Sequence, residues 1–199
     1  MATKREIVLE LLKQKPLVLS QELTAEGIDR KTIKRMTDSG ELIRVARGLY
    51  SAADYIPDSN HSLLEAHKLV RQGVICLLSA LAYYEIGTQN PSMVWMAIPN
   101  RNWRPRLENS PVQIVRFSGK SYTEGINEIN IDNEAVRIYN IPKTVADCFK
   151  YRNKIGLDIA IEALKDVLQQ KKAAVDELLY YAAVCRVRSV IIPYLESLI

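Results

Sequence analysis

The sequence predicts a mixed α/β protein of two domains: a small N-terminal domain of three helices and a β-hairpin, and a larger α/β domain that ends in a helical block. The length of 199 residues exceeds one small domain but falls short of two large ones. Hydrophobic residues make up 48% and charged residues 25%, the balance of an ordinary globular protein. Turn-forming residues gather at 56–60, between two periodic regions. We therefore expect domains at 1–57 and 58–199.

The N-terminal segment predicts two helices. Between Lys4 and Gln14 the apolar residues recur at helical spacing, which indicates an amphipathic helix that Pro16 brings to an end. Ser20 then has the side chain of an N-cap, and Gly27 is suited to the end of a short second helix.

A third helix and a hairpin complete this domain. Asp29 can cap a helix that runs to Ser39, with Ile33 and Met36 facing inward and Gly40 closing it. Two runs of β-type residues then flank Ala46-Arg47-Gly48, which predicts two short strands joined by a tight turn. Three helices followed by a hairpin in about 50 residues are typical of a winged helix-turn-helix domain.

The second domain mixes helices and strands before its helical block. We expect a helix over 62–71, a short strand near 73–77 and a helix over 79–86 that Ser79 caps. Four strand-like runs follow, at 93–99, 111–117, 126–131 and 135–140, with a hairpin turn at 132–134. Helical patterns then occupy 142–152, 157–170, 173–186 and 189–199, where Pro193 either kinks the last helix or sets its start later.

The positive charge of the chain is concentrated in one segment. The formal net charge is +4, and the segment 30–47 alone carries six positive and two negative residues, an excess of +4. A local excess of this kind is what phosphate binding requires. The six positive residues are Arg30, Lys31, Lys34, Arg35, Arg44 and Arg47.

These six residues are the candidate DNA-binding residues. A helix in the major groove needs long hydrogen-bond donors, and the third helix places four of them on its outward side. Arginine can contact guanine with two hydrogen bonds, so we expect Arg30 and Arg35 to read bases while Lys31 and Lys34 hold phosphates. Arg44 and Arg47 lie in the hairpin. The alternative for each residue is a solvated surface charge.

A second basic group is a candidate DNA or effector surface. Arg101, Arg104 and Arg106 surround Trp103 in a segment between two strands, and arginine beside an aromatic residue is common at interfaces. Lys150 and Arg152 follow the helix that begins near Pro142, where cations also offset the helix dipole.

The remaining features argue against several function classes. The P-loop, dinucleotide-binding, GxSxG and HExxH patterns are missing from the sequence, so we expect no enzyme activity and no cofactor. Three cysteines without a CxxC pair, and two distant histidines, predict buried thiols and no metal site. The N-terminus does not resemble a signal peptide, and the apolar run 73–84 is too short to span a membrane, so we expect a cytoplasmic protein.

The chain resembles the AbiEi family of antitoxins from type IV toxin–antitoxin and abortive-infection systems. Five blocks in order carry the resemblance over nearly the whole length: 42–51 (LIRVARGLYS), 94–99 (VWMAIP), 115–119 (VRFSG), 123–126 (TEGI) and above all 141–164 (IPKTVADCFKYRNKIGLDIAIEAL). The resemblance implies a winged helix that binds repeats in its own promoter on double-stranded DNA and represses the operon. The resemblance also implies that residues 30–35 form the DNA-contacting face and that Arg44 and Arg47 of the hairpin contact DNA beside it.

The same resemblance implies the partners. It implies that the C-terminal domain counteracts a nucleotidyltransferase-like toxin without a stable complex. Separately, repeated sites can be occupied by two copies that cooperate on DNA, so we expect a monomer in solution. Two alternatives stay open. One is a solitary transcription regulator whose second domain senses a ligand or partner. The other is an enzyme that brings together carboxylates such as Glu124 or Asp132 with Asp147.

Overall fold

The computed structural model describes residues 3–102, 107 and 110–198. These residues divide into two compact units. The first contains the described parts of 1–71 and 105–110 together with 130–136, and the second contains the described parts of 72–104, 111–129 and 137–199. Each unit is described by itself.

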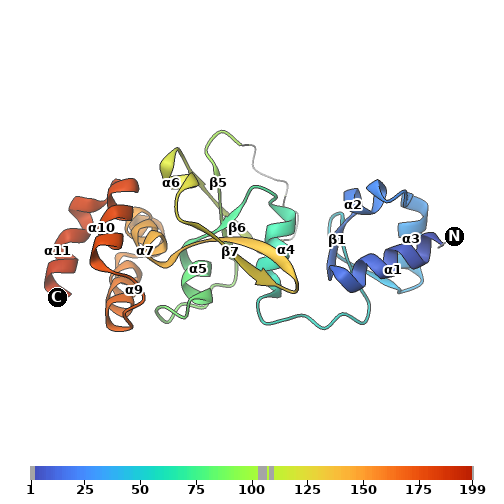
Figure 1. Ribbon diagram of the computed structural model, residues 1–199, viewed down its shortest axis with the longest axis horizontal. Coiled ribbons are helices and arrows are strands. Elements are labelled where there is room, and N and C mark those ends of the chain that lie inside the picture. The colour runs from blue at the N-terminus through green and yellow to red at the C-terminus, as the bar shows by residue number, and fades with distance from the viewer. Residues whose placement is uncertain (1–2, 103–106, 108–109, 199) are drawn as a thin grey trace. The chain divides into compact units, whose positions relative to one another are not determined.

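The N-terminal part of the first unit has three helices and a three-stranded sheet (Figure 1). The helices are α1 (Lys4–Gln14), α2 (Ser20–Ala25) and α3 (Arg30–Asp38). The strands are β1 (Leu17–Leu19), β2 (Leu42–Ala46) and β3 (Leu49–Ala52), in the order β1-β3-β2 with both pairings antiparallel. This is the winged-helix arrangement that the sequence predicted, with β1 as an additional strand.

Local sequence explains where these helices begin. The Thr3 side chain accepts a hydrogen bond from the Glu6 backbone N–H, and the Glu6 carboxylate accepts one from the Thr3 N–H, which forms a capping box. The expectation that Ser20 caps the second helix was wrong. Leu19 occupies the cap position, and Ser20 is the first helical residue because Leu17–Leu19 is drawn into a strand with β3.

One apolar core holds this part together. Val8 and Leu12 from α1 and Ile33 and Met36 from α3 are buried in it, with Leu23 of α2. They recur at the three- and four-residue spacing that places side chains on one face of a helix. The buried face of α3 therefore directs its remaining residues outward.

The first unit continues with α4 (His61–Leu69), after a non-regular segment that contains 56–60. The predicted helix over 62–71 is thus confirmed with small shifts at both ends. Asp132 and Asn133 both have positive φ, at 52° and 64°, as a two-residue hairpin turn requires. They join β7 (Ile126–Ile131) to β8 (Glu134–Tyr139), as predicted.

A five-stranded mixed sheet has the order β6-β5-β4-β8-β7. Its other strands are β4 (Val74–Ile75), β5 (Val94–Pro99) and β6 (Val112–Phe117). β4 pairs antiparallel with β5 and parallel with β8, and β5 pairs parallel with β6. Strand order in such a sheet depends on long-range pairing, which the sequence pattern did not indicate.

The helix α5 (Leu77–Tyr83) begins two residues earlier than expected. Ser79 is therefore not its cap. Its side chain is buried, and its Oγ accepts a hydrogen bond from the backbone N–H of Trp95 at 2.9 Å. The hydroxyl thus fastens α5 to β5 instead of closing the end of a helix.

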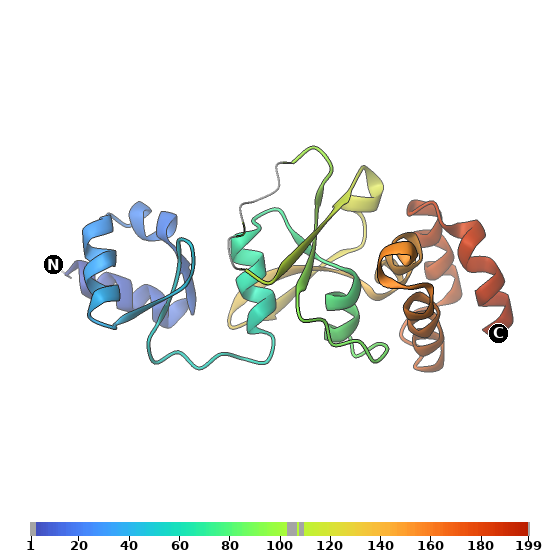
Figure 2. The same ribbon diagram turned by 180° about the vertical axis from the view of Figure 1, so that it is seen from behind.

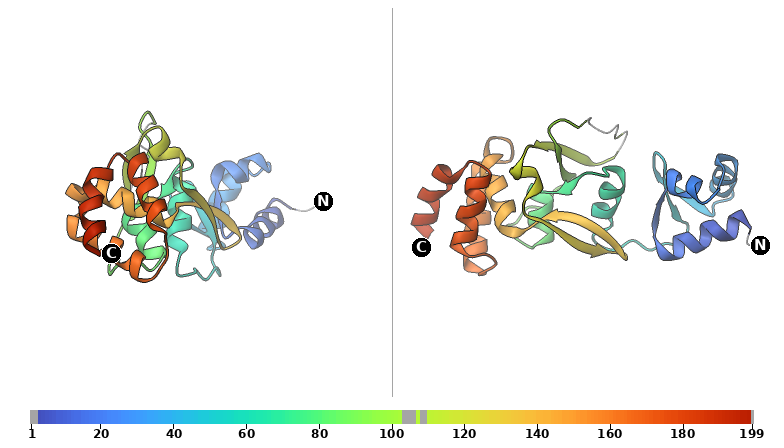
Figure 3. Two further views of the ribbon diagram at one scale, coloured as in Figure 1. Left: turned by 60° about the vertical axis from the view of Figure 1, so that its left-hand side comes forward. Right: turned by 45° about the horizontal axis from the view of Figure 1, so that its top comes forward.

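The C-terminal block consists of helices packed on one another (Figures 2 and 3). It contains α7 (Ile141–Lys150), α8 (Arg152–Ile155), α9 (Leu157–Gln169), α10 (Val175–Val184) and α11 (Arg188–Leu198), and the short α6 (Lys120–Thr123) precedes it. Eight consecutive residues of α7 are buried, because α5, α9 and α10 all contact it. Pro193 lies inside α11, so it does not delay the start of that helix. Among the described residues, every helix is too short or too polar to cross a membrane.

Candidate nucleic-acid interface

The third helix, α3, is fixed at its N-terminus by Asp29. The Asp29 carboxylate accepts a hydrogen bond from the Thr32 backbone N–H at 2.8 Å, as expected of a cap. It also accepts one from Lys4 Nζ at 2.6 Å. These two hydrogen bonds lower the pKa of Asp29 well below its usual range, and the one from Lys4 has the larger effect. The carboxylate therefore stays charged and anchors α3 against α1.

The two faces of α3 differ sharply in chemistry. Thr32, Ile33 and Met36 are buried against the core of the domain. The four cations that the sequence singled out on this helix, Arg30, Lys31, Lys34 and Arg35, are all exposed. Because residues four apart lie one above the other on a helix, Arg30 is aligned with Lys34 and Lys31 with Arg35.

Arg30 and Lys34 meet the hairpin across a cavity of about 580 Å³. Arg44 and Arg47 contribute from the hairpin, and Asp38 is the one acidic residue among the described residues of the lining. Four of the six predicted DNA-binding residues thus share one cavity. Lys31 and Arg35 belong to the exposed surface of α3 outside that lining.

The hairpin geometry depends on Gly48, which has a φ of +76°. Its carbonyl oxygen accepts a hydrogen bond from the Ser20 N–H at 2.8 Å. A Cβ at this position would lie 3.1 Å from Ser20 Oγ. Positive φ and this close approach both favour glycine. The tip of the hairpin is therefore held at the start of α2, beside the cationic face of α3.

Three polar residues in the same cavity were missed by the sequence analysis: Ser20, Thr37 and Tyr50. Tyr50 lies directly opposite Arg44 in the β2–β3 pairing. The available signal was the alternation of side chains along a strand, which places Tyr50 on the opposite face of β3 from Leu49 and Ser51. Tyr50 is half-buried there and also packs against the core of the domain. The Thr37 hydroxyl donates to the Ile33 carbonyl oxygen at 2.9 Å, which leaves it as an acceptor.

Arg35 has a local electrostatic role as well. It lies near Glu41, whose pKa is lowered mainly by a hydrogen bond from the Ser39 hydroxyl and then by Arg5. The positive charge of Arg35 contributes to that lowering. Part of the Arg35 charge is thus balanced by an acid, whereas Lys34 lies beside Arg30 and Arg44 in the cavity lining.

The second predicted basic group is only partly described. Arg101 is exposed in a turn after β5, and Arg104 and Arg106 lie outside the described residues. Lys150 Nζ donates to Ser121 Oγ at 3.3 Å, and Arg152 Nη1 donates to the Phe149 carbonyl oxygen at 2.8 Å. Arg152 therefore caps the C-terminal carbonyls of α7, which is the structural role that the sequence analysis also considered.

The carboxylates weighed for an enzyme each have a local partner. Asp147 is fully buried and lies 2.5 Å from Lys143 Nζ. Asp132 accepts a hydrogen bond from the Tyr55 hydroxyl at 2.5 Å, and Glu124 accepts one from the Tyr180 hydroxyl at 2.8 Å. Over residues 3–102, 107 and 110–198, no three side chains of the metal-binding types are grouped so that they could hold a metal ion.

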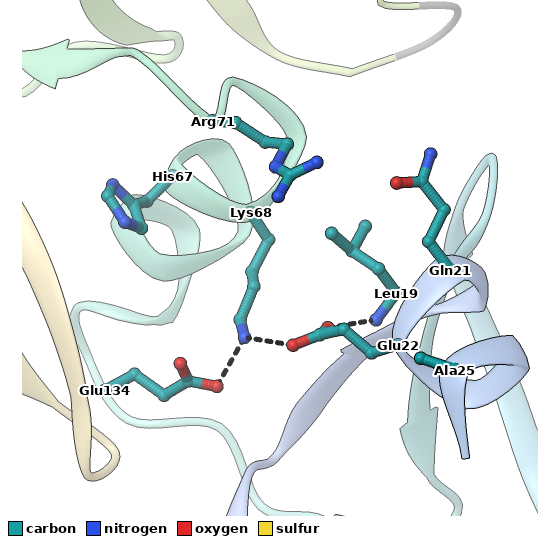
Figure 4. A pocket seen from close by; sticks show the side chains of 8 residues that line it. All are labelled: Leu19, Gln21, Glu22, Ala25, His67, Lys68, Arg71 and Glu134. Atoms are coloured by element: carbon teal, nitrogen blue, oxygen red, sulfur yellow. Dashed lines mark hydrogen bonds and ion pairs between the residues drawn. The ribbon is translucent and has the colours of Figure 1, made fainter.

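A second cavity of the first unit, of about 360 Å³, is balanced in charge (Figure 4). Lys68 is 9% exposed and reaches Glu134 at 2.5 Å and Glu22 at 3.8 Å. Glu22 also accepts a hydrogen bond from the Leu19 N–H at 2.7 Å. Since the buried cation is already shared by two carboxylates, this cavity is a poor site for a nucleic-acid phosphate.

The chain is similar to known proteins in sequence and in fold. Residues 6–53 match the sequence model of a family described as a transcriptional regulator, the AbiEi antitoxin. The structure is similar to the crystal structure of the Rv2827c protein from Mycobacterium tuberculosis, with a TM-score of 0.66 and 13% sequence identity. That match covers 94% of this chain and 75% of the other, and it shows a shared fold. A search of curated proteins found no match.

Proposed function

We propose that the protein is an antitoxin that binds repeats in its own promoter and represses the operon, because residues 6–53 match the sequence model of the AbiEi antitoxin transcriptional regulators. The observation that carries the proposal is the cavity between α3 and the hairpin. Arg30, Lys34, Arg44 and Arg47 converge there from two elements held in place by Asp29 and Gly48.

The arrangement suits a duplex. The major groove of B-DNA admits an α-helix, and the exposed face of α3 offers arginine and lysine donors to base edges and phosphates. Arg30 is proposed to read a base and Lys34 to hold a phosphate, because a guanidinium can form two parallel hydrogen bonds and an ammonium acts as a point charge. Arg44 and Arg47 of the wing then contact the adjoining backbone, with Tyr50 as a further hydroxyl donor.

DNA binding is tested by a gel shift with the purified full chain. The duplex upstream of its own gene is compared with a scrambled duplex of the same composition at two salt concentrations. Selective binding that weakens as salt rises supports a promoter-binding regulator, because each neutralised phosphate releases counterions. Equal binding to both duplexes contradicts operator recognition and leaves a general phosphate-binding module.

The antitoxin part of the proposal assigns toxin neutralisation to the C-terminal domain expected at 58–199, by an action that needs no stable complex with a nucleotidyltransferase-like toxin. The support is the match of residues 6–53 to the sequence model of an antitoxin family. Co-expression of the neighbouring gene with the full chain, and with a chain lacking 1–57, tests it. Rescue of growth by the full chain supports an antitoxin. If the neighbouring gene is not toxic, or if the full chain does not rescue growth, a solitary cytoplasmic transcription regulator is favoured.

A further inference from the structure

A cavity in the second unit has the lining of an anion site. Its volume is about 360 Å³, within the usual range for small-molecule sites. Three cations line it, Lys120, Lys150 and Arg186, together with the hydroxyls of Ser118 and Ser121. The other lining residues are glycine, alanine and valine, and none of the described residues that line the cavity is acidic. The chemistry of the walls therefore selects for negative charge.

The cations come from three separate segments of the chain. Lys120 begins α6, Lys150 ends α7, and Arg186 occupies the turn between α10 and α11. Arg186 has a φ of +60°, and its N–H donates to the Ala183 carbonyl oxygen at 3.0 Å. Residues distant in sequence are thus brought to one place by the packing of α7 and α10, and they are not neighbours along a single solvated helix.

Ser121 forms a buried polar point in the lining. Its side chain is 6% exposed, and its hydroxyl donates to the Val184 carbonyl oxygen at 3.0 Å. The Ser121 Oγ in turn accepts a hydrogen bond from Lys150 Nζ at 3.3 Å. Lys150 is thereby positioned over the cavity and not extended into solvent. Its other two N–H donors stay available, since an ammonium has three.

The charges in the cavity are incompletely balanced. Lys120 forms an ion pair with Glu124 at 3.6 Å, although its side chain is 79% exposed. Within the part of the chain that the structure describes, neither Lys150 nor Arg186 forms an ion pair with a carboxylate. Bringing cations together without anions is unfavourable, so a bound anion stabilises this arrangement.

We propose that this cavity binds the phosphoryl group of a small phosphorylated molecule, such as the 5′-phosphate of a nucleotide. A phosphomonoester has three terminal oxygens and nearly two negative charges, which matches three cations and the Ser118 hydroxyl better than a carboxylate does. Because the lining that the structure describes contains no aromatic residue, the cavity holds the phosphate and leaves the remainder of the molecule outside. The site goes beyond the proposed promoter binding, because every lining residue belongs to the second unit.

Isothermal titration calorimetry of the full chain tests the site with inorganic phosphate and with AMP, in a chloride buffer of low ionic strength. Lys150→Gln and Arg186→Gly each remove one cation. Glycine suits the positive φ of position 186, so this variant is expected to fold, and its circular-dichroism melt verifies that. Lys165→Gln is the matched control, because Lys165 is exposed on α9 and lies outside the lining.

Each pocket variant is expected to bind AMP and phosphate about tenfold more weakly than the natural chain, the loss typical of one charge-assisted hydrogen bond. Lys165→Gln is expected to bind as the natural chain does. Absence of binding by phosphate and AMP, or equal affinity in folded Arg186→Gly and Lys150→Gln, overturns the proposal. If these variants weaken binding to a DNA duplex while phosphate and AMP do not bind, the cations contact the DNA backbone and the small-molecule site is also overturned.

Discussion

Lys143 and Asp147 form an ion pair with Nζ 2.5 Å from Oδ2, and neither side chain is exposed to solvent. They lie four residues apart on α7, where the helix aligns their side chains. The Lys143 ammonium also lies 4.0 Å from the centre of the Tyr139 ring, and Cys185 Sγ donates to Asp147 Oδ1 at 3.1 Å. Burial raises the pKa of Asp147, and Lys143 opposes that rise.

Removing one member of this pair is expected to be more damaging than replacing both. Asp147→Ala leaves a buried ammonium without its counter-charge, which costs about 3–5 kcal/mol in the free energy of unfolding. The double substitution Lys143→Met/Asp147→Leu is expected to cost less, because it buries no charge. Urea unfolding followed by circular dichroism measures both. A double variant less stable than Asp147→Ala contradicts this account.

Gly48→Ala is expected to destabilise the hairpin for two reasons, the backbone conformation at this position and a close contact of the added Cβ. The positive φ costs about 1–2 kcal/mol in an alanine, and the added Cβ meets Ser20 Oγ at 3.1 Å. Gly40 has the same φ of +76° with open space around its Cβ position, so Gly40→Ala carries the backbone cost alone. Thermal unfolding compares the two variants. Equal losses show that the approach of the hairpin to Ser20 contributes nothing.

The cap at Asp29 predicts a dependence on pH. The folded-state pKa of Asp29 is lowered, so its stabilisation is complete above the unfolded value of 3.8 and is lost as pH falls toward the folded value. Asp29→Asn keeps a capping oxygen but has no charge for Lys4. The melting temperature of the natural chain is expected to exceed that of Asp29→Asn at pH 7, with the difference shrinking below pH 4. A difference that is constant with pH argues against the Lys4 contact.

The three thiols are expected to be unreactive in the folded protein. Cys76, Cys148 and Cys185 are buried, and burial raises the pKa of each thiol. Because the thiolate is the reactive form, a disulfide reagent at pH 8 is expected to modify them slowly in the native state. All three are expected to react at once in urea. Rapid native labelling of any one of them contradicts its burial.

Local signals were sufficient for α3 and the hairpin of the N-terminal domain. Asp29 before Ile33 and Met36 predicted α3 and its cap, and Gly48 between two β-type runs predicted the hairpin. The strand β1 was missed, because three residues are too few to show an alternating pattern and only pairing with β3 makes Leu17–Leu19 a strand. Ser79 had the side chain of a cap, but a tertiary hydrogen bond to Trp95 decided its position.

Sites built from distant segments were beyond the sequence pattern. Lys150 was noted as a cation near a helix end, yet its neighbours in the phosphate cavity include Lys120 and Arg186 from other elements. The cation set of the DNA-binding cavity was predictable because α3 and the hairpin are adjacent in sequence. Which of these cations line the cavity could not be predicted from the sequence, because it depends on how the hairpin packs on α2.

The most direct test of the central claim is fluorescence anisotropy of the full chain on its upstream duplex across a range of salt concentrations. The double variant Lys34→Ala/Arg44→Ala removes one cation from α3 and one from the hairpin, and Lys13→Ala removes a cation from α1, outside the cavity. The account predicts at least a tenfold loss of affinity for the double variant and a salt slope smaller by about 2, with little change for Lys13→Ala. Equal affinity and slope in the double variant and Lys13→Ala would contradict it.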